Sequence, residues 1–474
     1  MLRLSDIARA FKPSHRGGTL LRRDFLKLGA LGLALPQVLA LRALGKSSSP
    51  AGAKAKSCIV LFAWGGISHL DTWDLKPDAS SDIRGEFRPI DTSAHGVQMS
   101  EHLPLLARQA HHLAIVRSVH HAAPSHRSAA YWNLTGHAPP LLDANWDASR
   151  NDWPCLGSLT AAALERRSGP RGQASALPCA FALPYHMADG GRANGQDGGF
   201  LGLAYDPILV RPIGGRLYAG ISPSSGTIHL EPPPGVDAQR LAERRTLHAN
   251  LESFGRLGPV AETAAIERAN EQAFNMLLDP SVRDAFDLDK EPAALRASYG
   301  DHVCGQSTLL ARRLSDAGVP LVTVYCAAGD LNGSAGSHFD THGDNFNRLK
   351  RDMLPPLDQA SAALLQDLQQ RGRLEETLVV WLTEFGRTPK INGSAGRDHF
   401  PSCYSVAFAG GGVRGGQVYG RSNSIGSEPA EKACGPADLH ATIFHALGID
   451  PHLTLHDLTG RPHTLCDGRP LAIT

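Results

Sequence analysis

Continuous apolar runs, without alternation of polar and apolar positions, recur along the chain and predict strands that are buried on both faces. The runs cover residues 57–64, 112–119, 180–183, 319–326, 377–383 and 404–409. Glycine closes two of them, at Gly65 and at Gly386. Strands of this kind are typical of mostly parallel sheets that helices cover on both sides.

Segments of helical length separate these runs. We expect helices over 101–109, 125–136, 154–167, 345–370 and 437–447, and a series of polar helices over 236–300. Ser125 is a good N-cap for the second of these helices, and Gly136 is a good stop. The alternation of strands and helices predicts an α/β fold, with a doubly wound, mostly parallel central sheet flanked by helices.

Composition describes a soluble globular protein. The hydrophobic share is 42% and the formal net charge is +1, which gives no basic field for nucleic acid and no polybasic membrane patch. We therefore expect no nucleic-acid partner. The 22 histidines are many for this length, and histidine both moves protons and ligates metals. One large domain over 56–474 accounts for the length.

Residues 1–45 are expected to be an export leader and linker. Arg22 and Arg23 precede a modest apolar stretch over 28–41, which is typical of a twin-arginine signal, although Leu21 stands where serine or threonine is usual. The stretch is too short and too rich in glycine and alanine for a permanent membrane span. We expect the twin-arginine export machinery to deliver the protein to the periplasm or the cell exterior.

Eight cysteines in an exported chain invite disulfides. Cys58, Cys326 and Cys403 lie in or beside apolar runs, so we expect them to be buried thiols. Cys434 and Cys466 are the pair that we expect to form a disulfide, if any pair does.

Polar residues that can take part in catalysis or bind a metal ion follow four of the predicted strands. In chain order they are His69 and Asp71, Ser125 and His126, Asp340 and His342, and Glu384 and His399. Open α/β sheets bind ligands at the carboxyl ends of their strands, so these clusters are expected to meet at one edge. Carboxylate and imidazole pairs in loops often bind divalent metals.

Two of the carboxylates also have a structural explanation. Glu384 could cap a helix or pair with Arg387, and Asp340 could cap the helix that follows it. Ser125, His126 and Arg127 would form the start of a helix, where free amides and the helix dipole favour phosphate or sulfate. The convergence of four clusters favours a functional site over four separate structural roles.

These motifs resemble those of the alkaline phosphatase and sulfatase superfamily. Segment 125–136 resembles the sulfatase helix that carries the nucleophile and ends in Thr-Gly, and segment 383–386 resembles the Ser/Thr-Asp-His-Gly element, with Phe385 where histidine would stand. More closely, the chain resembles an exported bacterial branch called "domain of unknown function 1501", through its leader and its motifs at 65–74, 339–342, 384–389 and 396–399. The resemblance covers nearly the whole mature chain and implies an alkaline phosphatase/sulfatase-like fold.

The chain departs from this superfamily at two points. Gly65 and Gly66 replace the metal-binding acid that ends the first strand in other members, and the sulfatase pattern that forms formylglycine is absent. The resemblance therefore implies an altered centre with one metal ion or a changed pair, in which His69 or Asp71 substitutes for the missing acid.

The resulting hypothesis is an exported, metal-dependent hydrolase of phosphate or sulfate esters that acts on a small-molecule or glycan ester. The divalent metal would be Zn, Mn, Ca or Mg, and its expected ligands are Asp340, His342, Glu384 and His399, followed by Asp71 and His69. Ser125 or His126 would be the nucleophile, and Arg127 or Arg387 the anion clamp. The alternative is a non-catalytic periplasmic or surface binding protein on a degenerate hydrolase scaffold.

Overall fold

The computed structural model describes residues 54–474, apart from 145, 169–176, 211–234, 256–260, 328 and 333–337. The predicted export leader over 1–45 lies outside the described residues and stays a prediction. Within the described part, the structure contains no helix with the length and apolar character that a membrane crossing needs.

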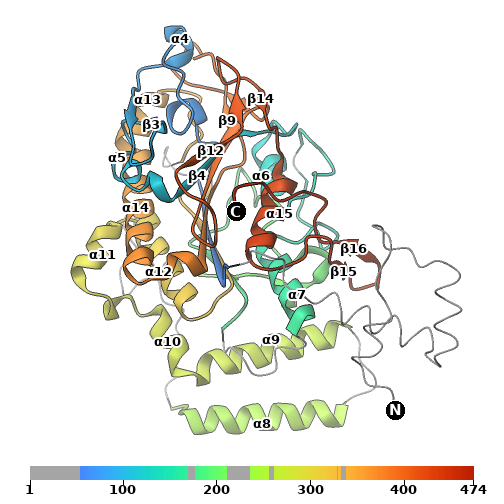
Figure 1. Cartoon of the computed structure of the whole chain (residues 1–474). Helices are drawn as coiled ribbons and strands as arrows, with labels where there is room; N and C mark the ends of the chain where they lie inside the picture. Colours follow the sequence, from blue (N-terminus) through green and yellow to red (C-terminus); the bar gives the residue numbers. More distant parts are fainter. Residues whose placement is uncertain are drawn as a thin grey trace, which may run out of the picture. The chain divides into compact units, whose positions relative to one another are not determined.

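A sheet of eight strands forms the centre of the domain, in the order β12-β4-β11-β8-β1-β7-β5-β6 (Figure 1). The strands are β1 Ser57–Phe62, β4 Leu113–Val119, β5 Ala180–Leu183, β6 Ile208–Leu209, β7 Leu321–Tyr325, β8 Thr377–Leu382, β11 Tyr404–Ala409 and β12 Gln417–Tyr419. Only β11 runs against its neighbours β4 and β8, and all other pairings in this sheet are parallel. The predicted α/β fold with a mostly parallel sheet is confirmed.

The two central strands are buried throughout, as their unbroken apolar pattern predicts. β1 and β8 pair in register from Ser57 opposite Thr377 to Phe62 opposite Leu382, and every residue of both strands is buried. Burial of each large apolar side chain stabilises the fold by roughly 1.5–3 kcal/mol. The centre of the sheet is therefore a rigid support for the loops at its edge.

Helices cover both faces of the sheet (Figure 1). On one face, α12 (Val303–Asp316) contacts β1 and β7, and α14 (Leu354–Gln370) packs on α12. On the other face lie α6 (His126–Thr135), α7 (Leu156–Ser168) and α15 (Pro436–Ala446). The polar segment 236–300 forms α8 (Ala238–Gly255), α9 (Ala261–Leu278), α10 (Pro280–Phe286) and α11 (Ala293–Tyr299).

Prolines explain two differences from the predicted helices. The helix expected over 101–109 is only α5 (Pro104–Ala107), because Pro104 favours the first helical turn and follows strand β3 (Gln98–Ser100) closely. The helix expected over 345–370 divides into α13 (Asn345–Arg348), a π-helical turn (Leu349–Met353) and α14. Pro355 and Pro356 cannot donate backbone hydrogen bonds to the preceding turn, so the helix is interrupted there.

The expected disulfide between Cys434 and Cys466 is wrong, since all eight cysteines lie in the described part and are free thiols. The Cys434 thiol donates to the Ser118 carbonyl at 3.7 Å, and the Cys466 thiol donates to the Ala437 carbonyl at 3.1 Å. The two side chains are thus held by different backbone groups.

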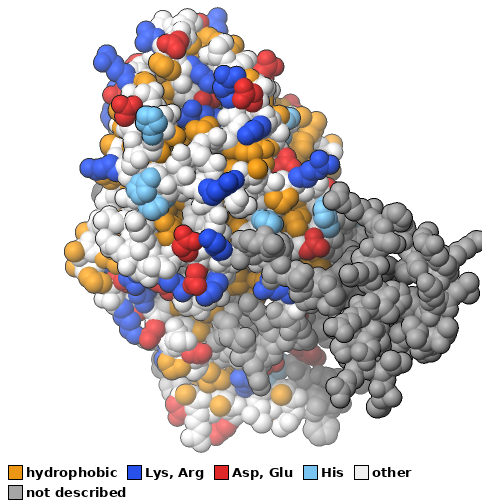
Figure 2. Space-filling view, viewed as in Figure 1, with side chains coloured by type: hydrophobic (Ala, Val, Ile, Leu, Met, Phe, Trp, Pro, Cys, Tyr) orange, Lys and Arg blue, Asp and Glu red, His pale blue; other side chains and the backbone are white. Residues whose placement is uncertain are grey.

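On the surface visible in Figure 2, charges of both signs are interspersed, as the small net charge predicts.

A pair of glycines turns the chain at the end of β1 and allows another loop to approach. Gly65 has φ +110° and Gly66 has φ +74°. A Cβ atom on Gly65 would lie 2.4 Å from the backbone nitrogen of Asp340, and the Phe339 amide donates to the Trp64 carbonyl at 3.0 Å. The glycine pair therefore sets the position of the segment that carries Asp340.

We predict that Gly65→Ala lowers the unfolding temperature and displaces the 339–342 segment. The alanine would have to adopt an unfavourable positive φ, which costs about 1–3 kcal/mol. Its Cβ atom would also clash with backbone atoms that cannot move aside. Gly96→Ala is the matched control, because Gly96 also has a positive φ, of +74°, but open space around it. Thermal unfolding that shows equal losses for the two variants would contradict the close approach at Gly65.

Candidate metal centre

Four side chains from three loops converge at the carboxyl edge of the sheet. His126 is the first residue of α6, after β4, and Asp340 and His342 follow β7. His399 lies in β10 (His399–Phe400), just before β11, and because β11 runs in the reverse direction its start lies at the same edge. One ligand atom from each of the four side chains lies within 4.8 Å of the others.

One carboxylate oxygen is the centre of this cluster. Asp340 Oδ1 lies 3.2 Å from His126 Nε2, 3.0 Å from His342 Nε2 and 3.3 Å from His399 Nε2. The Nε2 atoms of His342 and His399 are themselves 2.9 Å apart. Two ring nitrogens at this distance require either a shared proton or a common cation between them.

The other ring nitrogen of each histidine faces a hydrogen-bond acceptor. The pairs are His126 Nδ1 with Glu384 Oε1 at 2.8 Å, His342 Nδ1 with Asp398 Oδ1 at 2.8 Å, and His399 Nδ1 with the Pro124 carbonyl at 2.9 Å. With a metal ion bound, such acceptors would hold the proton on Nδ1 and leave the lone pair of Nε2 for the ion. The three Nε2 atoms point at one place beside Asp340.

This donor set fits a divalent transition metal. Ligand atoms about 2.0–2.1 Å from a tetrahedral zinc ion lie roughly 3.3–3.4 Å from one another. Here the three distances from Asp340 Oδ1 and the distance between His342 and His399 are 2.9–3.3 Å, and all four atoms lie within 4.8 Å of one another. Three imidazole nitrogens and one carboxylate suit Zn or Mn, whereas Ca and Mg prefer shells of oxygen. The residues present therefore fit a resident metal ion.

Charges around the cluster keep Asp340 ionised. Burial raises the pKa of the Asp340 carboxyl, but hydrogen bonds from the three histidines and the charge of Arg387 outweigh it and hold this pKa well below its usual range. Burial lowers the pKa of His399 to about 4, so that this imidazole is neutral at pH 7. Hydrogen bonds to Asp340 raise the pKa of His342 above its ordinary value.

Glu384 is fully buried just past the end of β8, but it is not one of the four converging ligands. Its Oε1 accepts from the Gly65 amide at 2.9 Å as well as from His126. The pair with Arg387 does not form either, since the Arg387 guanidinium contacts Asp340 Oδ1 at 2.6 Å. Glu384 thus orients a ligand of the cluster, where the sequence predicted a direct ligand.

His69 and Asp71 also lie outside the cluster. Asp71 is fully buried, and its two oxygens accept from Arg397 at 2.8 and 3.1 Å. Asn345 and the Ser68 hydroxyl also donate to Asp71 Oδ2. His69 Nε2 bonds to the Gly426 carbonyl at 2.8 Å. The Asp71 carboxylate is saturated by these partners, so its geometry is that of a structural ion pair.

The three other predicted catalytic residues are engaged elsewhere. The Ser125 hydroxyl donates to Ser128 Oγ at 3.0 Å. Arg127 donates to the Trp146 carbonyl and to Asn194. Arg387 is fully buried and donates to the carbonyls of Gly65, Gly66 and Arg397 in addition to Asp340.

Sequence reasoning missed two features of the cluster. His126 was expected as a nucleophile and lies among the ligand atoms, and Asp398, which holds His342, was not singled out. The signal for Asp398 was present in the sequence, since it directly precedes His399 in a glycine-flanked loop. The sequence placed His126 at the same edge of the sheet as Asp340, but it did not show that the imidazole nitrogen faces the Asp340 carboxylate.

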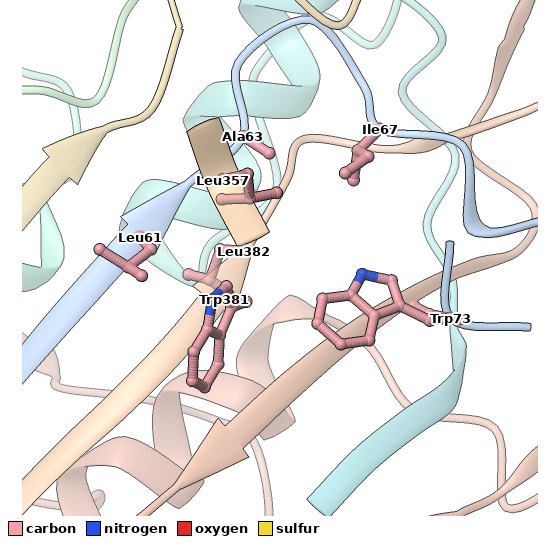
Figure 3. Close-up of a pocket in the computed structure, with 8 residues that line it drawn as sticks. Leu61, Ala63, Ile67, Trp73, Leu357, Trp381 and Leu382 are labelled. Atoms are coloured by element: carbon pink, nitrogen blue, oxygen red, sulfur yellow. The ribbon is translucent and has the colours of Figure 1, made fainter. Parts of the chain in front are cut away.

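The apolar cavity in Figure 3 is a separate feature. It measures about 10 Å³ and is lined by Leu61, Ala63, Ile67, Trp73, Leu357, Trp381, Leu382 and Ser405. This volume corresponds to at most about one water molecule. The cavity is therefore a packing void between the sheet and α14.

A family model described as "Protein of unknown function (DUF1501)" matches residues 55–473. The chain belongs to this DUF1501 family. The resemblance inferred from the motifs is confirmed at the level of the family. Among curated proteins, none matches the sequence significantly.

Solved structures similar to this DUF1501 protein include members of the alkaline phosphatase and sulfatase superfamily. A sulfatase from Pseudoalteromonas sp. has a TM-score of 0.36 and 11% identity over 88% of this chain and 71% of its own. An alkaline phosphatase superfamily protein from Vibrio parahaemolyticus has a TM-score of 0.35 and 10% identity, over 90% and 73%. A phosphonate monoester hydrolase from Silicibacter pomeroyi has a TM-score of 0.35 and 12% identity, over 88% and 76%. These scores are too low to support any conclusion about function.

Two aspartates distinguish the structural ion pair from the metal centre. We predict that Asp71→Asn destabilises the DUF1501 domain by about 3–5 kcal/mol, because it leaves the Arg397 guanidinium buried without a full partner. The folded fraction should keep its metal. Asp340→Asn should instead lower metal content at least tenfold. Urea unfolding and elemental analysis of both variants check this, and metal loss in Asp71→Asn at unchanged stability would contradict it.

Proposed function

We propose that this DUF1501 protein is an exported, metal-dependent hydrolase of phosphate or sulfate esters, whose centre binds one divalent ion through His126, Asp340, His342 and His399. A single observation carries the proposal: three imidazole Nε2 atoms converge on one carboxylate oxygen, while an acceptor fixes each opposite ring nitrogen. Metal-binding histidines in proteins regularly donate their other ring N–H to an acceptor of this kind.

The side chains around the centre can hold one metal ion. The two other carboxylates beside the centre, Glu384 and Asp398, each accept a hydrogen bond from a ligand histidine. Among the described residues, no second group of three or more metal-binding side chains forms. We therefore place the ion among the four converging atoms and assign Zn or Mn in preference to Ca or Mg.

The residues around the centre would orient the metal ligands and leave one side open to solvent and substrate. A bound divalent ion would act as a Lewis acid and lower the pKa of water. Glu384 and Asp398 would hold two imidazoles in the metal-binding tautomer, and Arg387 would orient Asp340. His342 is 45% exposed, so solvent and substrate could approach from its side.

An anionic substrate fits the start of α6. The Ser125 side chain makes no capping hydrogen bond to the first amides of this helix, and these amides, together with the helix dipole, favour a negative group. The ligand His126 is the first residue of the same helix. A phosphate or sulfate group of a small-molecule or glycan ester would thus meet both the amides and the metal ion.

A non-catalytic periplasmic or surface binding protein is the second candidate. One observation favours it: four protein side chains would occupy all four positions of a tetrahedral zinc ion, as in structural sites, whereas catalytic zinc sites keep a position open. The engagement of Ser125, Arg127 and Arg387 with other protein groups also leaves no obvious nucleophile or anion clamp. Catalysis therefore requires a fifth coordination position on the exposed side of His342.

The twin-arginine motif near Arg22 and Arg23 supports export to the periplasm or cell exterior. Export through the twin-arginine machinery would suit a chain that folds around its metal before it leaves the cytoplasm.

Metal analysis and hydrolysis assays test the proposed activity. We predict one Zn or Mn ion per chain in protein produced with both metals, and hydrolysis of p-nitrophenyl phosphate or sulfate that a chelator abolishes and added metal restores. His399→Ala should lose the ion and the activity together, because it removes one of four ligands.

Ser125→Ala is the matched control for this test, since it alters the neighbouring residue without removing a ligand. It should keep the ion and most of the activity. A folded protein with less than a tenth of an ion per chain would refute the proposal. A fully loaded protein that hydrolyses no phosphate or sulfate ester would instead establish the binding-protein alternative.

We also predict that metal affinity increases with pH. Burial lowers the pKa of His126, but its hydrogen bonds to Asp340 and Glu384 outweigh burial and raise this pKa above the usual 6.5. A hydrogen bond to Asp340 also raises the pKa of His342, so both histidines bind protons that a metal ion must displace. Each displaced proton makes the apparent affinity rise roughly tenfold per pH unit until the pH passes that pKa. Competition with a zinc indicator between pH 5.5 and 8.5 measures this, and a flat profile would contradict the assignment of these histidines as ligands.

A further inference from the structure

The backbone of Glu384 is held by two side chains that sequence motifs did not single out. The Glu384 carbonyl accepts from His121 Nε2 at 2.6 Å and from Asn133 Nδ2 at 2.8 Å. Both donors are buried, with 7% of His121 and 1% of Asn133 exposed. A carbonyl with two side-chain donors has little freedom to rotate, so the peptide group of Glu384 is fixed.

The orientations of these two donors are themselves fixed. His121 Nδ1 accepts from the Ala123 amide at 3.1 Å, so the ring proton must sit on Nε2, where it meets the Glu384 carbonyl. Asn133 Oδ1 accepts from the Tyr404 hydroxyl at 2.8 Å, which sets the amide so that Nδ2 faces Glu384. Neither donor can turn away without losing a second buried hydrogen bond.

Helix α6 contacts Glu384 at two points. His126 binds the Glu384 carboxylate at 2.8 Å, and Asn133 binds its carbonyl. The two residues are seven positions apart, which places them on the same face of the helix two turns from each other. The carboxylate and the carbonyl of one residue thus fix both the position and the rotation of the helix that carries a ligand.

We propose that His121 and Asn133 are positioning residues for the metal centre. They act through Glu384: they hold its backbone so that its carboxylate keeps the proton of His126 on Nδ1 and directs Nε2 toward Asp340. This inference rests on the proposed metal site. It adds two residues, from the loop after β4 and from α6, whose effect on metal affinity comes without contact with the ion.

The test compares His121→Phe, which keeps an aromatic ring without a donor, with His121→Gln, whose Nε2 can donate from a similar place. Full-chain variants are titrated with Zn against a chelating indicator, and their unfolding is measured without metal. We expect His121→Phe and Asn133→Leu to weaken zinc binding about 10- to 100-fold and His121→Gln to restore it to within a few-fold. Tyr299→Phe is the control, because it removes a buried hydroxyl that bonds to Asp367 at 2.9 Å, away from the centre.

Equal zinc affinity in His121→Phe, Asn133→Leu and Tyr299→Phe, with similar losses of stability, would overturn the proposal and leave the two residues as structural only. The His126 tautomer gives a readout that needs no metal. Nitrogen chemical shifts of 15N-histidine-labelled protein, recorded at a pH high enough for the His126 ring to be neutral, should show a proton on Nδ1 in the wild type and a mixture of tautomers in His121→Phe. If the wild type binds no zinc but the tautomers still differ between the wild type and His121→Phe, the metal site is refuted and the positioning role stands. If the tautomer is the same in both proteins, the positioning role is refuted.

Discussion

The hydrogen bond between the Glu384 carboxylate and His126 joins the end of β8 to the start of helix α6. Glu384 follows β8 near the centre of the sheet, and His126 starts the helix after β4, which is separated from β8 by the reversed strand β11. The carboxylate also accepts from the Gly65 amide at the end of β1. One buried anion therefore connects three strand ends, and without these donors its burial would cost several kcal/mol. The position of His126 in the cluster depends on that connection.

Buried charge at this edge is balanced pair by pair. Asp340 faces Arg387, Asp71 faces Arg397, and Glu384 faces His126. Removal of either partner of such a buried pair is costly, because the remaining charge has neither water nor a counterion. The short antiparallel pair of β9 (Gly386–Arg387) and β10 sets His399 directly opposite Arg387. The arginines thus contribute to the site mainly by fixing acids and loops, and the open side at His342 is where an external ligand can enter.

The sequence predicts the strands well and the contacts between them poorly, for a physical reason. Strands such as 377–383 are recognisable because a strand buried on both faces must be apolar throughout. Their order in the sheet depends on packing among distant segments, so the reversal of β11 has no local signature. The same distinction explains the site. Asp340, His342 and His399 were predicted as ligands from their loops, whereas the Asp71 pair with Arg397 joins segments far apart in the chain and could not be read from either one.

His126 shows how one change of role can alter the chemistry of a whole site. In the superfamily that the motifs resemble, this part of the helix supplies a nucleophile. Here an imidazole at the same place points its Nε2 at Asp340 and its Nδ1 at Glu384. An imidazole whose two ring nitrogens both face carboxylates is a poor nucleophile, because neither nitrogen has a lone pair free to attack. The loss of an acid at Gly65 follows the same logic, since that position now donates its amide to Glu384 and makes room for the Asp340 segment. In the proposed one-ion site, protein hydrogen bonds would orient the ligands, and the exposed side of His342 would decide whether the ion also acts on a substrate.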